Sequence, residues 1–214
     1  MQSTRAVRIA WSFLVGVTAI EGGALFWIIE PALGDPQRLE HYFFMPRSNP
    51  VAWGVSLLTA ALYTAYVARR SPLIGEFIFS PSKWSPYFGL RFVALAESFV
   101  TGVLEEVFFR RFVMDWALQQ GTSAGVQIAL SAIVFGLAHG CWGFFTGNFR
   151  AGAASSIATG FLGASLGIVY IVGGRSLLPC IAAHIAINLL LEPWLILAAA
   201  SGSWGRGTFG SKPP

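Results

Sequence analysis

Six long apolar stretches constrain this chain more than any other feature of its sequence. A membrane-spanning helix needs about 20 mainly apolar residues. Stretches of that kind lie near residues 7–29, 51–68, 87–120, 123–142, 151–172 and 177–200. The sequence therefore predicts an all-α fold, a polytopic transmembrane helical bundle with about six spans.

The composition supports the same class. Hydrophobic residues make up 55% of the chain and charged residues only 11%, whereas about a quarter of a soluble domain is usually charged. Lys and Arg mostly flank the apolar stretches, as in membrane proteins. There is no basic run with interleaved aromatic residues, which argues against nucleic acid as a partner. We expect a multi-pass integral membrane protein in contact with lipid.

No soluble domain, internal repeat or long linker is visible between these stretches. We expect one transmembrane helical domain over residues 1–200. The remaining segment, residues 201–214, is rich in Gly, Ser and Pro, and this composition is typical of a disordered tail.

Ionisable residues gather in three of the predicted spans. The third span contains Glu105, Glu106 and Arg110, the fourth contains His139, and the sixth contains His184. Each costs about 2.5–3.5 kcal/mol on insertion scales, so intramembrane residues of this kind are functional candidates by default.

Helical geometry separates their roles. Glu106 and Arg110 are four residues apart and can pair on one face. Glu105 is rotated by about 100° from Glu106, which leaves it free to act as a general base. His184 and Asn188 are also four apart, and two donors on one face suit an oxyanion site.

His139 completes the chemistry, because it could hold a water molecule together with Glu105. A base, a positioned water and an oxyanion site are the minimum for amide hydrolysis by water. Each group alone has a simpler interpretation, as a buried ion pair or an interhelical hydrogen bond. Two Glu, two His and an Asn on three apolar helices favour the catalytic interpretation.

At these positions the sequence resembles the CPBP family of intramembrane proteases, which includes the CAAX prenyl-protein endopeptidases. The family motifs EExxxR, FxxxH and HxxxN correspond here to residues 105–110, 135–139 and 184–188. The resemblance covers about residues 98–191. One departure is Arg111, where members commonly have Gly.

The resemblance implies an enzyme, a CAAX-like intramembrane endopeptidase that acts on a peptide or a lipidated protein. It implies that Glu105 activates water with help from His139, and that His184 and Asn188 form the oxyanion site. Supporting roles are implied for Glu106, Arg110 and Phe135. The natural substrate stays open, as do the roles of Glu21 in the first predicted span and Glu30 just after it.

A zinc peptidase is the nearest alternative, since zinc accepts His and carboxylate ligands. The HExxH signature is absent, so we expect no cofactor. If zinc is bound, its candidate ligands are Glu105, Glu106, His139 and His184.

Three further alternatives remain. Residues 163–167 read G-x-S-x-G and could indicate a serine protease, although that motif needs a strained strand-to-helix turn. Cys180 and His184 are four apart and could mimic a thiol dyad. Intramembrane Glu, His and Arg also occur in transporters, and a non-catalytic binding or immunity protein could use the same scaffold.

Overall fold

The computed structural model describes residues 4–35, 37, 40, 43, 49–70, 88–141, 143 and 147–200. The regular structure in this part of the chain is helical throughout, which confirms the all-α prediction. Four helices are long and apolar enough to cross a membrane, and the helix Ala124–His139 is apolar but shorter. The predicted tail 201–214 lies outside the described residues.

The helices follow the predicted stretches closely. In chain order they are α1 (Thr4–Ile29) with a short 3-10 turn η1 (Glu30–Ala32), α3 (Pro50–Arg70), α5 (Phe88–Glu106), the π-helical η3 (Val107–Met114), α6 (Asp115–Gln119), α7 (Ala124–His139), α9 (Phe149–Val172) and α10 (Leu178–Ala200).

The third predicted stretch differs from a uniform α-helix. It runs as one rod through α5, η3 and α6, and its central eight residues are π-helical. The π segment starts at Val107, directly after Glu106. Single-turn π segments inside α-helices occur frequently at functional sites, and this one borders the predicted catalytic pair.

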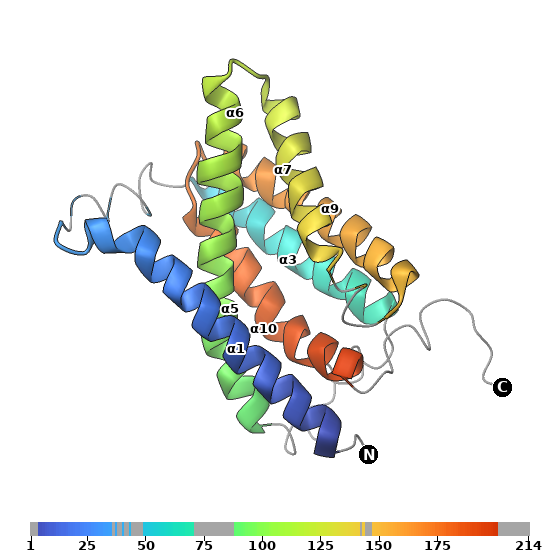
Figure 1. Ribbon diagram of the computed structural model, residues 1–214. Coiled ribbons are helices and arrows are strands. Elements are labelled where there is room, and N and C mark those ends of the chain that lie inside the picture. The colour runs from blue at the N-terminus through green and yellow to red at the C-terminus, as the bar shows by residue number, and fades with distance from the viewer. Residues whose placement is uncertain are drawn as a thin grey trace.

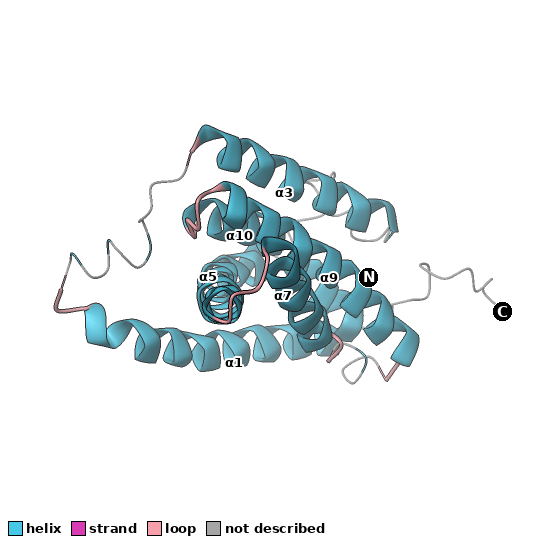
Figure 2. Cartoon of the chain, turned by 90° about the horizontal axis from the view of Figure 1, so that it is seen from above, coloured by secondary structure: helices cyan, strands magenta, loops and turns pink. Residues whose placement is uncertain are grey.

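Successive long helices run in opposite directions, as short connections between spans require (Figure 1). Seen from above, α1 lies along one side of the bundle and α3 along the other, with α5, α7, α9 and α10 between them (Figure 2). Accordingly, α1 packs on α5 and α10, whereas α3 packs on α10 and α9. The two outer helices thus enclose four helices, of which α5, α7 and α10 carry the motifs.

Helices α7 and α9 pack closely against each other. A Cβ added at Gly136 would lie 2.5 Å from the Ser156 carbonyl oxygen and 3.1 Å from the Cα of Gly160. Small residues at such contacts let two helical backbones approach. This contact sets the position of the last turn of α7, which carries His139.

A polar cluster ties the turn after α9 to the helices α6 and α7. Arg175 has a φ of 71° and pairs with Asp115 and with Gln127. The Tyr170 hydroxyl lies 3.1 Å from Asp115 Oδ2, and Arg111 Nη1 lies 3.8 Å from the same oxygen. Arg111, the departure from the family pattern, therefore joins this cluster, beyond the predicted site.

Candidate active site

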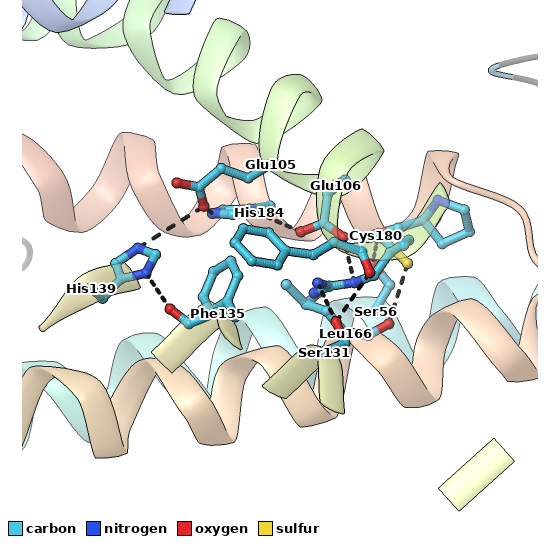
Figure 3. A network of polar contacts seen from close by, with 12 residues as sticks. Ser56, Glu105, Glu106, Ser131, Phe135, His139, Leu166, Cys180 and His184 are labelled. Carbon is cyan, nitrogen blue, oxygen red and sulfur yellow. Dashed lines mark hydrogen bonds and ion pairs between the residues drawn. The ribbon is translucent and has the colours of Figure 1, made fainter. Parts of the chain in front are cut away.

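Glu105 lies between two histidines that come from different helices. Its Oε2 is 3.5 Å from Nε2 of His184 on α10 and 4.0 Å from Nε2 of His139 on α7. The side chains of Glu105 and His139 are 20% and 22% exposed, and that of His184 is 2% exposed. Three residues predicted from separate motifs thus meet at one partly open position (Figure 3).

A close helix approach explains why Glu105 reaches His184. Gly102 on α5 faces Ile185 on α10, and an added Cβ would lie 2.7 Å from Ile185 Cγ1 and 3.3 Å from its backbone nitrogen. These two residues neighbour the site residues along their helices. A larger side chain at Gly102 would push α5 away from α10 and separate the carboxylate from the imidazole.

Glu106 holds the other side of His184. Its Oε1 is 2.7 Å from His184 Nδ1, and its Oε2 is 3.0 Å from Arg110 Nε. Arg110 and Glu106 are both fully buried, and Arg110 also donates to the Ser131 hydroxyl at 3.3 Å. Arg110 offsets the charge of Glu106. The Glu106 carboxylate in turn fixes the His184 imidazole, and Figure 3 shows these two side chains next to each other.

Phe135 organises both imidazoles. Its backbone oxygen lies 2.9 Å from His139 Nδ1, and its ring centroid is 4.5 Å from that of His139 and 5.7 Å from that of His184. The Arg110 guanidinium also lies over the ring, 5.6 Å from its centroid. The aromatic residue of the second motif therefore packs against members of all three motifs.

The proton on His139 can be assigned from its partner. A carbonyl oxygen only accepts hydrogen bonds, so Nδ1 of His139 must be the donor to Phe135. In the neutral ring, Nε2 is then an acceptor, and it points toward Glu105.

Asn188 is not joined to this network. It lies one turn after His184 on α10 and is half-buried, but it makes no hydrogen bond within the part of the chain that the structure describes. The other members of the predicted site contact one another directly, whereas Asn188 shares only a helix with His184.

The alternative nucleophiles have other contacts. Ser165 lies inside α9, and its hydroxyl donates to the Phe161 carbonyl at 3.0 Å. Cys180 is buried, and its thiol lies 3.4 Å from the Leu166 carbonyl oxygen. Within the described residues, neither the Ser165 hydroxyl nor the Cys180 thiol is hydrogen bonded to a histidine.

The zinc alternative concerns Glu105, Glu106, His139 and His184. Among the described residues, no group of three or more His, Cys, Asp or Glu side chains has the spacing of a metal site. The Glu106–His184 contact does match the carboxylate support that metal-bound histidines usually have. The same contact would orient a histidine that binds no metal.

The sequence analysis missed a second group of acidic residues beside the site. Glu97 of α5 and Glu192 of α10 were ionisable residues within predicted spans, which was the signal that could have identified them. Glu97 is fully buried, and Glu21 of α1 joins it through Thr101.

Comparison with protein families connects this geometry to a known class. Residues 87–190 match the family described as Type II CAAX prenyl endopeptidase Rce1-like. This match covers just under half of the chain. The matched region contains all three motifs, from Glu105 to Asn188. No curated protein and no solved structure matches the chain.

The match supports a CAAX-type intramembrane endopeptidase in general and a location in the membrane. The four long apolar helices agree with this location. The helices α1 and α3 precede the matched region, so Glu21 comes from outside it, and Glu192 lies just beyond its end.

Proposed function

We propose that this protein is an intramembrane endopeptidase in which Glu105 activates a water molecule to hydrolyse a peptide bond. One observation carries the proposal: Oε2 of Glu105, which is buried and has no hydrogen-bond partner among the described residues, stands between the Nε2 atoms of His139 and His184, at 4.0 and 3.5 Å. A base within reach of a positioned water is the main requirement for this reaction.

The distance between Glu105 and His139 suits a bridging water. At 4.0 Å the two acceptor atoms are too far apart for a direct hydrogen bond. Polar atoms at such separations are commonly joined by water. A water that donates one hydrogen to Glu105 and one to His139 would have its oxygen lone pairs directed at an incoming carbonyl carbon.

The reaction then balances as a proton transfer through Glu105. The carboxylate takes one proton from water while the hydroxide oxygen bonds to the carbonyl carbon, which leaves a negative charge on the carbonyl oxygen. When the C–N bond breaks, Glu105 returns the proton to the leaving nitrogen. The products are a carboxyl group and an amine.

The negative oxygen would be stabilised by His184 and Asn188. Glu106 holds Nδ1 of His184, so the Nε2 atom faces the site and donates when the ring is protonated. Asn188 would swing toward the same oxygen only when substrate is bound, since it has no partner within the described part of the chain.

The substrate we propose is a membrane-embedded or lipidated peptide, such as a prenylated CAAX protein. The matched family is described as a CAAX prenyl endopeptidase. In addition, apolar side chains near the site face outward, with Phe108 45% and Leu137 69% exposed. A peptide carrying an apolar group could reach Glu105 from the lipid side.

The test is hydrolysis of a peptide panel by the purified full-length protein in detergent, including a prenylated CAAX peptide and its unprenylated match. Wild type is compared with Glu105→Gln, which keeps the shape but removes the base. We expect cleavage to fall by a factor of about 10² to 10⁴ in the variant. Equal cleavage by both proteins would refute the role of Glu105.

A chelator arm distinguishes the zinc alternative. Cleavage that requires Glu105 and survives chelation supports water activation by the carboxylate alone. Cleavage that is lost with chelator and restored by added zinc would move the assignment to a metallopeptidase. No cleavage of any peptide would favour the non-catalytic binding role.

A further inference from the structure

A buried carboxyl cluster lies next to the candidate active site and is not used by the reaction described above. It consists of Glu21 on α1, Glu97 on α5 and Glu192 on α10, with the Thr101 hydroxyl between the first two. Neither Glu21 nor Glu192 belongs to the region that matches the Rce1-like family. The cluster is therefore assembled largely by parts of the chain outside that match.

The hydrogen bonds of Thr101 require an acid proton. Its Oγ1 lies 2.7 Å from Glu97 Oε1 and is also hydrogen bonded to Glu21 Oε2. A hydroxyl has one hydrogen to donate, and an ionised carboxylate has none. Thr101 can donate to one of the two carboxyl groups, so the other must bring its own proton.

The contact between Glu97 and Glu192 also requires an acid proton. Their carboxyl groups are in hydrogen-bonding contact with each other. The Oε2 atoms of both are buried and have no donor as a partner. Glu97 is fully buried, so water does not supply one. Two ionised carboxylates cannot hydrogen bond to each other, but a carboxylic acid and a carboxylate can share one proton.

The cluster is close enough to act on the candidate active site through its charge. Glu21 and Glu97 interact electrostatically with Glu105, as do Glu192 and Glu105. Glu21 also interacts with His139 and His184. Glu21, Glu97, Glu192 and Glu105 thus lie close together in a low-dielectric bundle, and their full ionisation would be costly.

We propose that Glu97 and Glu192 share one proton, and that this pair is a positioning group that sets the charge felt by Glu105. The shared proton holds the pair at a single negative charge and joins α5 to α10. Glu21, tied in through Thr101, extends the same proton-sharing group to α1. This role rests on the proposed function, because it concerns the protonation of the base.

The first experiment needs no substrate. Infrared titration of the full-length protein in lipid nanodiscs detects the carbonyl stretch of protonated carboxyl groups. It is run on a Glu105→Gln background, so that Glu105 itself does not contribute. We expect a band at neutral pH that shifts in D2O. Glu192→Gln should weaken this band, and Glu97→Gln should weaken it further, because Glu97 takes part in both proton-requiring contacts. Adding Glu30→Gln, at an exposed carboxyl far from the cluster, should leave it intact.

A band of unchanged intensity in both cluster variants would overturn the shared proton. The outcome does not depend on whether any peptide is cleaved, so it separates this proposal from the proposed function. If one cluster variant fails to fold, the other decides the question, and Thr101→Val tests the link to Glu21 in the same way.

The second experiment is the pH profile of cleavage with Glu105 present. Either single Gln variant keeps one negative charge in the pair, so its profile should resemble that of wild type. The double variant Glu97→Gln/Glu192→Gln removes that charge, so Glu105 ionises more readily. The acid limb of the profile should move to lower pH by about one unit. An unshifted limb in a folded, active double variant would show that the pair does not act on Glu105.

Discussion

At the scale of single residues, the site is a chain of contacts in which each group fixes the next. Arg110 offsets the charge of Glu106, Glu106 holds His184, and His184 faces Glu105. His139 is fixed separately, through the Phe135 carbonyl. The two imidazoles are thus oriented by different groups: His184 by the Glu106 carboxylate and His139 by the Phe135 backbone oxygen.

Variants of the Glu106–Arg110 pair should affect stability and activity differently. Glu106→Ala leaves a fully buried guanidinium unpaired, at an expected cost of about 3–5 kcal/mol in the free energy of unfolding. The double variant Glu106→Leu/Arg110→Met removes both charges and should recover most of that stability. It should still cleave poorly, because His184 has lost its carboxylate. Thermal unfolding and peptide cleavage, measured on both variants, check this.

A double variant that regained activity along with stability would contradict the role given to Glu106. It would mean that the carboxylate serves only to neutralise Arg110.

Ser165 provides the matching negative prediction. Its hydroxyl donates a hydrogen bond to the Phe161 carbonyl of the same helix. Ser165→Ala removes only this local hydrogen bond, so it should change the cleavage rate less than about twofold. The measurement is the rate on the same peptide. Loss of cleavage in a folded Ser165→Ala protein would revive the serine protease alternative.

At the scale of helices, two close approaches and one irregular segment bring the motifs together. Gly102 lets α5 meet α10, and Gly136 lets α7 meet α9. The π segment Val107–Met114 follows the glutamate pair and carries Arg110. The catalytic geometry therefore depends on backbone contacts that involve no ionisable group.

Gly136 tests this dependence. An alanine there would bring its Cβ to 2.5 Å from the Ser156 carbonyl oxygen, so α7 must shift and carry His139 with it. We expect a loss of about 1–3 kcal/mol in stability together with reduced cleavage. Gly125→Ala, on the same helix with nothing within 4 Å, is the control and should be neutral or slightly stabilising. The measurement is thermal unfolding of both variants. Equal unfolding temperatures for Gly136→Ala and Gly125→Ala would contradict the packing argument.

At the scale of the whole molecule, the alternation of helix direction determines which ends share a membrane face. The start of α1, the end of α7 and the end of α10 lie toward the same side of the bundle in Figure 1. The two cysteines report on this arrangement. Cys141, just after α7, is exposed, whereas Cys180 in α10 is buried.

A membrane-impermeant maleimide should therefore label Cys141 and leave Cys180 unmodified in sealed vesicles. Labelling should occur only from the face at which an N-terminal tag is accessible to protease, because four spans separate the two positions. Cys141→Ser is the control and should abolish labelling. Labelling of Cys141 from the opposite face would mean that one of the first four stretches does not span.

The sequence alone determined the fold class and the position of every long helix, because a stretch of about 20 apolar residues has few alternatives to a membrane helix. It also selected Glu105, Glu106, His139 and His184, because ionisable residues are costly in such helices. The Glu106–Arg110 pair followed from helical periodicity, which acts over four residues and can be read from the chain.

Only the tertiary structure decided which side chains meet across helices. It placed His184 against Glu106, whereas helical spacing had related His184 only to Asn188. It also joined Glu21, Glu97 and Glu192, which come from three separate helices. Such contacts depend on the rotation and approach of neighbouring helices, which the glycine contacts and the π segment set. Periodicity along one helix contains no information about the helix that packs against it.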